Sequence, residues 1–178
     1  MLILSEEGRF DVPCALLLGG FDGLHRGHEA LLKRAKATGL PVGITSIFGG
    51  KAGGELFTRS ERRDIFSQAG IAFVLEFAFS EAFRMTPPED FLRDLFVRID
   101  ARAVFCGEDF RFGRDAAGTP ERLRALAPCP VTVLPLAEEG GEKIATSRIK
   151  RMVADGDMAG ANALLLSPYF LAGQVEHG

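Results

Sequence analysis

Residues 19–28 carry the sequence GGFDGLHRGH, which stands between an apolar run, Ala15–Leu18, and a helix-like run, Glu29–Ala37. This order predicts a strand, a tight turn and the start of a helix. The glycines of the turn let the backbone bend sharply and approach a ligand closely. The helix that follows directs its free amide groups and the positive end of its dipole at the same place. The stretch therefore predicts an anion-binding site.

Two histidines, His25 and His28, lie three residues apart in this stretch, so they face the same side of a first helical turn. Gly27 between them leaves room for a phosphate. Imidazoles suit such a site because they donate hydrogen bonds to a phosphate whose negative charge grows during displacement at phosphorus. The chain has neither the Gly-x-x-x-x-Gly-Lys-Ser/Thr of a P-loop nor the Gly-x-Gly-x-x-Gly of a dinucleotide site.

Two other interpretations of the histidines stay open. They could be ordinary surface or packed residues, or two metal ligands at helical spacing. The metal interpretation is the weaker one, because the third histidine, His177, lies at the far end of the chain and no cysteine or carboxylate cluster completes a zinc pattern. We expect phosphate binding and assign no metal ligand.

Composition indicates a globular protein with one core. The chain has 178 residues, of which 25% are charged, and a formal net charge of −3, so it lacks the broad basic surface that nucleic-acid binding needs. Its three cysteines are widely spaced beside apolar runs, which is typical of reduced thiols. No signal peptide and no apolar run of membrane-spanning length is visible. We expect a cytoplasmic protein without nucleic-acid or membrane partners; protein partners stay open.

Short apolar runs alternate with helix-like runs along the chain. Strands are predicted at Ala15–Leu18, Val42–Phe48, Phe73–Phe77, Ala103–Cys106 and Val131–Leu134, and helices at Glu29–Ala37, Ser60–Gln68, Glu89–Arg98, Glu121–Ala127 and Asp157–Leu166. The alternation is typical of an α/β fold, a Rossmann-like parallel sheet with helices on both faces. Helix caps are expected at Thr58, Thr86 and Thr119. Ligands bind such sheets at the carboxyl ends of the strands.

Three further segments are candidates for binding. Residues 49–54, GGKAGG, form a glycine-rich loop with one cation, Lys51, and a plain connection is the simpler interpretation of it. In Gly107–Gly113 the phenylalanines either plug the core or wall a planar ring, with Asp109 aimed at a hydroxyl, a ring nitrogen or Mg²⁺. Lys143–Lys150 combines two hydroxyls with three cations, which indicates a second phosphate-binding helix start rather than simple N-caps.

Taken together, these segments resemble the FMN adenylyltransferase (FAD synthetase) module of the bacterial bifunctional riboflavin kinase/FAD synthetases, in the nucleotidyltransferase superfamily with its His-x-Gly-His signature. Residues 19–28 are similar to the family's Gly-Asn-Phe-Asp-Gly-Val-His-x-Gly-His, Gly107–Gly113 to its Gly-x-Asp/Asn-Phe-x-Phe-Gly, and Lys143–Lys150 to its Arg-x-Ser-Ser-Thr-x-Ile-Arg. Residues 1–166 would form the adenylyltransferase domain. Residues 167–178 would be an extended tail leading toward a riboflavin kinase module that this chain lacks, so we expect no kinase activity.

The resemblance implies transfer of AMP from Mg²⁺-ATP to FMN, giving FAD and pyrophosphate. It places the catalytic pair, His25 and His28, on the ATP phosphates. It assigns ATP binding to Gly19, Phe21, Asp22, Gly23, Gly27, Lys143, Thr146, Ser147, Arg148 and Lys150, and flavin binding to Asp109, Phe110, Phe112 and Lys51. Mg²⁺ is the expected cofactor, ATP and FMN are the expected partners, and FAD is the expected product.

The chain departs from the family pattern at several places. Gly20 replaces an asparagine, and Lys143 and Lys150 stand where the family has arginines, although lysine cannot hold a phosphate bidentately. After Phe48 the family has a Pro-His-Pro loop, where this chain has a shorter glycine-rich one. Two alternatives stay open: an adenylyl- or cytidylyltransferase for another phosphorylated small molecule, and a weakly active nucleotide- or flavin-binding module.

Overall fold

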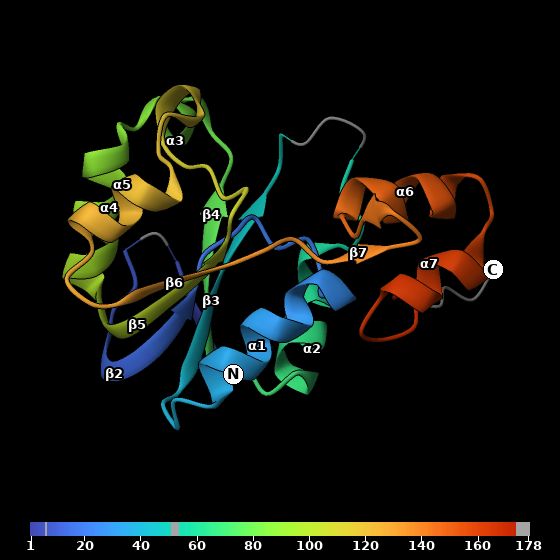
Figure 1. Ribbon diagram of the computed structural model, residues 1–178, viewed down its shortest axis with the longest axis horizontal. Coiled ribbons are helices and arrows are strands. Elements are labelled where there is room, and N and C mark those ends of the chain that lie inside the picture. Colours follow the sequence, from blue (N-terminus) through green and yellow to red (C-terminus); the bar gives the residue numbers. More distant parts are fainter. Residues whose placement is uncertain (6, 51–53, 174–178) are drawn as a thin grey trace.

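The β-branched and aromatic runs of the sequence become the strands of one parallel sheet. The computed structural model describes residues 1–5, 7–50 and 54–173 (Figure 1). The six strands lie in the order β1-β4-β3-β2-β5-β6, with bounds β1 (Leu2–Leu4), β2 (Phe10–Leu17), β3 (Val42–Phe48), β4 (Phe73–Ala78), β5 (Ile99–Gly107) and β6 (Val131–Leu134). The predicted strands are confirmed, and the short edge strand β1 is an addition.

Helices cover both faces of the sheet, as predicted (Figure 1). One face carries α1 (Glu29–Lys36) and α2 (Arg59–Gln68), and the other carries α3 (Glu81–Met85), α4 (Pro88–Arg98) and α5 (Pro120–Leu126). A small hairpin, β7 (Glu138–Glu139) with β8 (Glu142–Lys143), leads to α6 (Thr146–Ala154) and α7 (Met158–Leu164). Two short 3₁₀ turns are η1 (Arg26–His28) and η2 (Arg114–Ala116).

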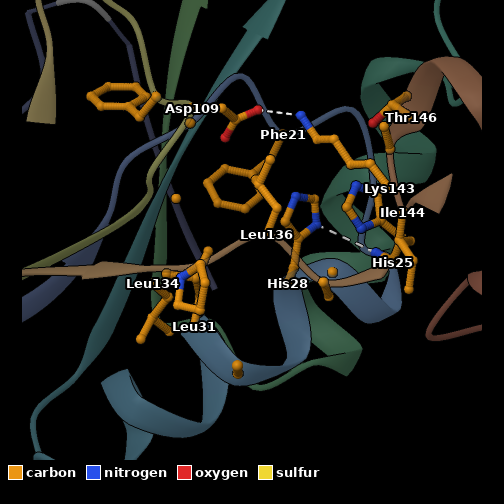
Figure 2. A pocket seen from close by; sticks show the side chains of 18 of the residues that line it. Phe21, His25, His28, Leu31, Asp109, Leu134, Leu136, Lys143, Ile144 and Thr146 are labelled. Atoms are coloured by element: carbon orange, nitrogen blue, oxygen red, sulfur yellow. Dashed lines mark hydrogen bonds and ion pairs between the residues drawn. The ribbon is translucent and has the colours of Figure 1, made fainter. Parts of the chain in front are cut away.

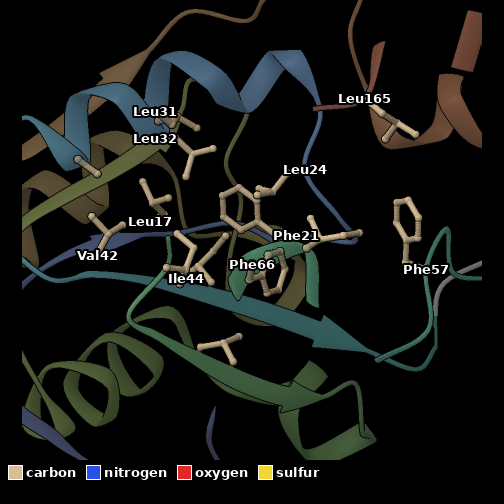
Figure 3. Packing of buried hydrophobic residues seen from close by; sticks show 14 of the residues in the cluster. Leu17, Phe21, Leu24, Leu31, Leu32, Val42, Ile44, Phe57, Phe66 and Leu165 are labelled. Atoms are coloured by element: carbon tan, nitrogen blue, oxygen red, sulfur yellow. The ribbon is translucent and has the colours of Figure 1, made fainter. Parts of the chain in front are cut away.

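Two apolar clusters form because successive residues of a strand point to opposite faces. Ala15 and Leu17 of β2 join Leu31 of α1 and Phe66 of α2 in one cluster (Figure 3). Leu16, between them, belongs to the other cluster, beneath α4 and α5. The central strands are thus buried on both faces, which is why their sequences are continuous apolar runs rather than alternating ones.

The topology creates a crevice at the carboxyl end of β2. From β2 the chain continues to β3 and β4 on one side, and then crosses to β5 and β6 on the other side. The connections that leave β2 and β5 therefore diverge toward opposite faces, and open α/β sheets bind ligands at such a point. Residues 19–28 follow β2 here, and the segment after Gly107 follows β5.

Two of the three predicted helix caps are confirmed. Thr58 accepts the amide of Glu61 at 3.3 Å, and the Glu61 carboxylate accepts the amide of Thr58 at 2.7 Å, which makes a complete capping box for α2. Thr119 caps α5 ahead of Pro120. These two helices therefore begin where the local sequence predicts.

The expected cap at Thr86 is wrong. Pro87 is the N-cap of α4, and its side chain can accept no hydrogen bond, so α4 begins at Pro88 without a side-chain cap. The Thr86 hydroxyl instead donates to the carbonyl of Ala82 at 3.0 Å, at the end of α3. The short helix α3 is absent from the sequence-based elements, and it takes the residue that was expected to start the next helix.

The C-terminal part packs on the α1–α2 side of the molecule. The helix predicted at Asp157–Leu166 is α7, with Asp157 as its N-cap. Beyond it, the rings of Tyr169 and Phe170 contact the ring of Phe57, at centroid distances of 5.3 and 5.7 Å. The described part of the expected tail therefore lies against the domain.

Cys14 and Cys106 are buried free thiols and Cys129 is a half-buried one, as predicted. Among the residues described here, no helix is both long and apolar enough to cross a lipid bilayer.

Candidate functional site

A cavity of about 420 Å³ opens at the carboxyl ends of β2 and β5 (Figure 2). We call it the histidine cavity, because His25 and His28 line it. Its walls come from the turn after β2, the first turn of α1, the loop after β5, the end of β6 with the segment that follows it, and the segment that joins β8 to α6. The residues expected in the site that line this cavity are Gly19, Phe21, His25, Gly27, His28, Asp109, Phe110, Lys143 and Thr146. The fold thus brings together the three segments that the sequence singles out.

The two histidines lie ring against ring at the start of α1. His25 has an extended backbone (φ −125°, ψ 168°) just before η1, and His28 ends η1. Their ring centroids are 3.6 Å apart with an interplanar angle of 20°, and the Phe21 ring packs on His28 at 4.6 Å. The His25 amide donates to His28 Nδ1 at 3.4 Å. Because Nδ1 accepts this bond, a neutral His28 carries its hydrogen on Nε2.

Burial keeps both imidazoles neutral near pH 7. It lowers the pKa of His25 from 6.5 to about 4. Burial first, and then repulsion from a protonated His25, hold the pKa of His28 well below 6.5. His25 is 6% exposed, and its buried Nδ1 has no hydrogen-bond partner among the described residues. Since an unpaired buried polar atom is costly, the ring is suited to a ligand that supplies the missing partner.

Gly27 is required by the packing around His25. A Cβ at this position would lie 2.9 Å from both Nδ1 and Cε1 of His25 and 3.1 Å from the carbonyl oxygen of Ile144. Any side chain would therefore push the histidine ring or the segment before α6. The sequence explains this glycine by space for a phosphate, and the structure adds the close approach of two protein segments.

An ion pair spans the cavity from the loop after β5 to the hairpin: Lys143 Nζ donates to Asp109 Oδ2 (Figure 2). The two side chains are 40% and 50% exposed. Attraction between such solvated charges contributes at most about 1 kcal/mol. An anion that enters the cavity can therefore separate Lys143 from Asp109 at small cost.

The start of α6 has no side-chain cap. Its N-cap is Ala145, with φ −142° and ψ 151°, so Thr146 and Ser147 are helical residues rather than N-caps. Thr146 lines the cavity, whereas Ser147 is exposed and does not. The first-turn amides of α6 thus lack the side-chain acceptor that most helices provide, and such amides bind anions well.

Five expected nucleotide-binding residues do not line this cavity, namely Asp22, Gly23, Ser147, Arg148 and Lys150. Asp22 is 1% exposed, and its carboxylate pairs with Arg62 at 2.7 Å and with Lys150 at 2.9 Å. Lys150 also donates to the carbonyl of Gly54. These charges therefore link the turn after β2 to α2 and α6.

Gly23 and Arg148 also have structural partners. Gly23 has φ +118°, and a Cβ there would lie 2.6 Å from the Phe57 ring. Arg148 donates to the carbonyls of Glu139 and Glu142, at 3.0 Å each, and so ties α6 to the β7–β8 hairpin. Lys51, expected at the flavin, lies outside the described residues.

A second cavity, of about 330 Å³, adjoins the first, and we call it the phenylalanine cavity. Six phenylalanines line it: Phe77, Phe79, Phe83, Phe91, Phe110 and Phe112. Phe110 and Phe112 are expected flavin-binding residues, and their rings stack with centroids 5.4 Å apart. Phe112 also belongs to the core, which confirms the packing interpretation of this loop, and binding of a planar ring stays a prediction. The other four come from β4, α3, α4 and the link between β4 and α3, and sequence reasoning missed them. The available signal was the close recurrence of Phe77, Phe79 and Phe83 around an unrecognised helix.

No group of three His, Cys, Asp or Glu side chains that could hold a metal ion occurs within the described ranges. Asp109 is the only carboxylate among the described residues that line the histidine cavity. This donor set fits a cation that arrives with most of its oxygen ligands already supplied by phosphates and water, as Mg²⁺ does. It does not fit a dedicated protein site.

The sheet topology and the histidine cavity identify the class as a Rossmann-like α/β protein with a ligand cavity at the switch point of its sheet. The family model for FAD synthetase matches residues 8–148. The chain belongs to the FAD synthetase family.

Curated relatives agree with this family. The bifunctional riboflavin kinase/FMN adenylyltransferase of Escherichia coli is 30% identical over 181 residues, covering 93% of this chain and 58% of that protein. The protein of the same name from Bacillus subtilis is 29% identical over 194 residues, covering 99% and 60%. An FAD synthetase of Listeria monocytogenes is 26% identical over 178 residues, covering 92% and 72%. The chain thus spans 58–60% of the length of the first two relatives.

The fold also has a counterpart among solved structures. The crystal structure of a macrolide-efflux protein from Streptococcus pneumoniae superposes with a TM-score of 0.85, over 95% of this chain and 63% of that chain. The sequence identity is 22%, so this likeness concerns the fold alone.

Proposed function

We propose that the chain is an FMN adenylyltransferase, which transfers AMP from ATP to FMN and gives FAD and pyrophosphate. The observation that carries the proposal is that the histidine cavity and the phenylalanine cavity share a wall, formed by Gly19, Gly20, Phe110 and Arg111. The first cavity holds the donors that a triphosphate needs, and the second holds the aromatic surfaces that a flavin ring needs. A flavin in the second cavity can present its phosphate to the first.

The reaction is an in-line displacement at the α-phosphorus of ATP. A phosphate oxygen of FMN forms the new bond to this phosphorus, the bond to the β-bridging oxygen breaks, and pyrophosphate leaves with that electron pair. No covalent intermediate with the protein is needed. Positioning and stabilisation of the developing charge supply most of the rate in such transfers.

His25 and His28 are the proposed donors to the phosphates. Both are neutral before the substrate binds, and the negative charge of a triphosphate favours their protonated form. Lys143 and Thr146 line the same cavity, and Thr146 is the first residue of α6, whose start has no side-chain cap. Three kinds of donor thus converge on one anion, which is the arrangement that stabilises charge in the transition state.

Asp109 would hold a magnesium ion that arrives on ATP, since it is the carboxylate of the cavity wall. When bound, Mg²⁺ neutralises charge on the phosphates and on the leaving pyrophosphate. Lys143, whose ion pair with Asp109 is half exposed, would then be available to donate to a phosphate.

The remaining expected residues belong to the proposal in a supporting way. The turn after β2 and the start of α6 are held in place by contacts outside the cavity, made by Asp22, Gly23, Arg148 and Lys150. Ser147 adds an exposed hydroxyl to the first turn of α6. The flavin contact of Lys51 stays a proposal from the resemblance. We further propose that residues 1–166 form the adenylyltransferase domain and that residues 167–178 form a tail that follows it.

The proposal is tested by offering the purified chain Mg²⁺-ATP with FMN, with riboflavin, or with a non-flavin sugar phosphate, and FMN with Mg²⁺-CTP. FAD and pyrophosphate in equal amounts should appear only with ATP and FMN. AMP transfer to the sugar phosphate, or activity with CTP, would favour a transferase for another phosphorylated small molecule. Tight binding of ATP or FMN without turnover would favour the binding module.

A further inference from the structure

Arg62 is a buried arginine that lies in the first turn of α2, outside the expected site. It is 1% exposed and is the largest fully buried side chain in the described part of the chain. Removing a guanidinium from water costs several kcal/mol, and apolar replacements of buried ion pairs are often neutral for stability. Stability alone therefore does not explain why this position carries an arginine.

Arg62 makes five polar contacts: three hydrogen bonds through Nε and Nη1, and two ion pairs through Nη2, which has no hydrogen bond among the described residues. They join two carbonyls, one hydroxyl and two carboxylates, as follows: Nε to Phe57 O at 3.0 Å, Nη1 to Ile47 O at 2.8 Å and to Ser46 Oγ at 3.4 Å, and Nη2 to Asp22 at 2.7 Å and to Glu55 at 2.8 Å. One side chain thus connects the turn after β2, the end of β3 and the segment before α2.

Two of these contacts reach the turn after β2, which carries the two histidines. The first is the direct ion pair with Asp22. The second passes through Ser46, whose hydroxyl accepts from Arg62 and donates to the carbonyl of Phe21 at 2.9 Å. The Phe21 ring in turn packs on His28 (Figure 2). The guanidinium therefore holds the backbone of Phe21 and the side chain of Asp22, which come shortly before His25 in the chain.

We propose that Arg62 is the positioning residue for the histidine pair: by fixing Phe21 and Asp22 it sets the place of the His28 ring in the cavity. This inference rests on the proposed adenylyl transfer for its kinetic consequence. Arg62 is not among the residues that line the cavity, so it acts through its neighbours. A lysine would keep the charge, but its three donors sit on one nitrogen and cannot serve the five partners.

The test compares Arg62→Met and Arg62→Lys with a matched variant, Arg63→Met. Arg63 is the next residue of α2, and it pairs with Glu76 of β4 at 2.6 Å, away from the histidines. We expect both Arg62 variants to lower kcat roughly 10- to 100-fold, with KM for ATP and FMN within about threefold, because a small misplacement costs transition-state contacts most. Arg63→Met should keep kcat within about twofold.

A second readout needs no turnover. In the ligand-free full chain, the histidine ring protons, assigned with His28→Gln, should shift in Arg62→Lys and stay unchanged in Arg63→Met, because Phe21 moves relative to His28. A folded Arg62→Lys protein with wild-type kcat and unshifted His28 signals would overturn the proposal, even if Arg62→Met does not fold. A wild-type chain that makes no FAD would reject the proposed function instead, and the ring shifts would still decide the role of Arg62.

Discussion

At the scale of single residues, the cavity is distinguished by two imidazoles that are stacked and kept uncharged. Their closeness follows from Gly27, because the missing side chain allows the His25 ring and the segment before α6 to approach α1. His-x-Gly-His can be read directly from the sequence. The stacking and the depressed pKa values cannot, because they depend on how the His25 ring is packed and buried, and part of that packing comes from Ile144, more than a hundred residues away.

Substitution of Gly27 by alanine should displace His25. The added Cβ would lie 2.9 Å from the ring, so we expect turnover to fall roughly 10- to 100-fold. Gly39→Ala is the matched control, since a Cβ there meets nothing within 4 Å, and only its positive φ is strained. Steady-state FAD formation by the two folded variants gives the comparison, and equal loss in both would contradict the packing role of Gly27.

The buried His25 should make stability depend on pH. Its pKa is about 4 in the folded protein and 6.5 when exposed, so between these values the unfolded chain binds more protons. The free energy of unfolding should therefore fall as the pH drops from about 6.5 to 4. Urea unfolding of the wild type and of His25→Gln at pH 7 and pH 4.5 measures this, and the variant should lose less. Identical losses would show that His25 is not held neutral by the fold.

At the scale of elements, local signals were sufficient for strands β2 to β6 and for most helix starts. Thr58 and Thr119 begin their helices because capping is decided within four residues. The expected cap at Thr86 is wrong for a local reason as well, since the short helix α3, capped by Ser80, ends at that residue. The edge strand β1 is likewise too short to be distinguished from an apolar terminus.

Glu61 connects the start of α2 to the C-terminal segment. Its carboxylate accepts the amides of Thr58 and of Ala172, each at 2.7 Å, and the residue is 1% exposed. Glu61→Ala should lower the free energy of unfolding by about 1–3 kcal/mol and should expose residues 167–173 to proteolysis. The control is Glu121→Ala, in the first turn of α5 but exposed. Denaturant titration and limited proteolysis that cannot distinguish the two variants would contradict this role.

At the scale of the whole molecule, the topology assembles what the sequence leaves scattered. The parallel order was predictable from alternation, and it places residues 19–28 and 107–113 at neighbouring strand ends. The partners of Asp22 were not predictable, because Arg62 and Lys150 come from two other helices and no spacing relates them. The phenylalanine cavity was predictable only in part, since two of its six rings belong to a recognised motif.

The central claim is that the histidine cavity performs adenylyl transfer to FMN. The most direct measurement is FAD and pyrophosphate formed from FMN and Mg²⁺-ATP by the wild type, by His28→Ala and by Arg26→Ala, an exposed neighbour in the same turn. Equal amounts of both products should appear with the wild type and with Arg26→Ala. Turnover should fall about 100-fold or more in folded His28→Ala, as for loss of one preorganised donor. Unchanged turnover in His28→Ala, or no FAD from the folded wild type, would contradict the claim.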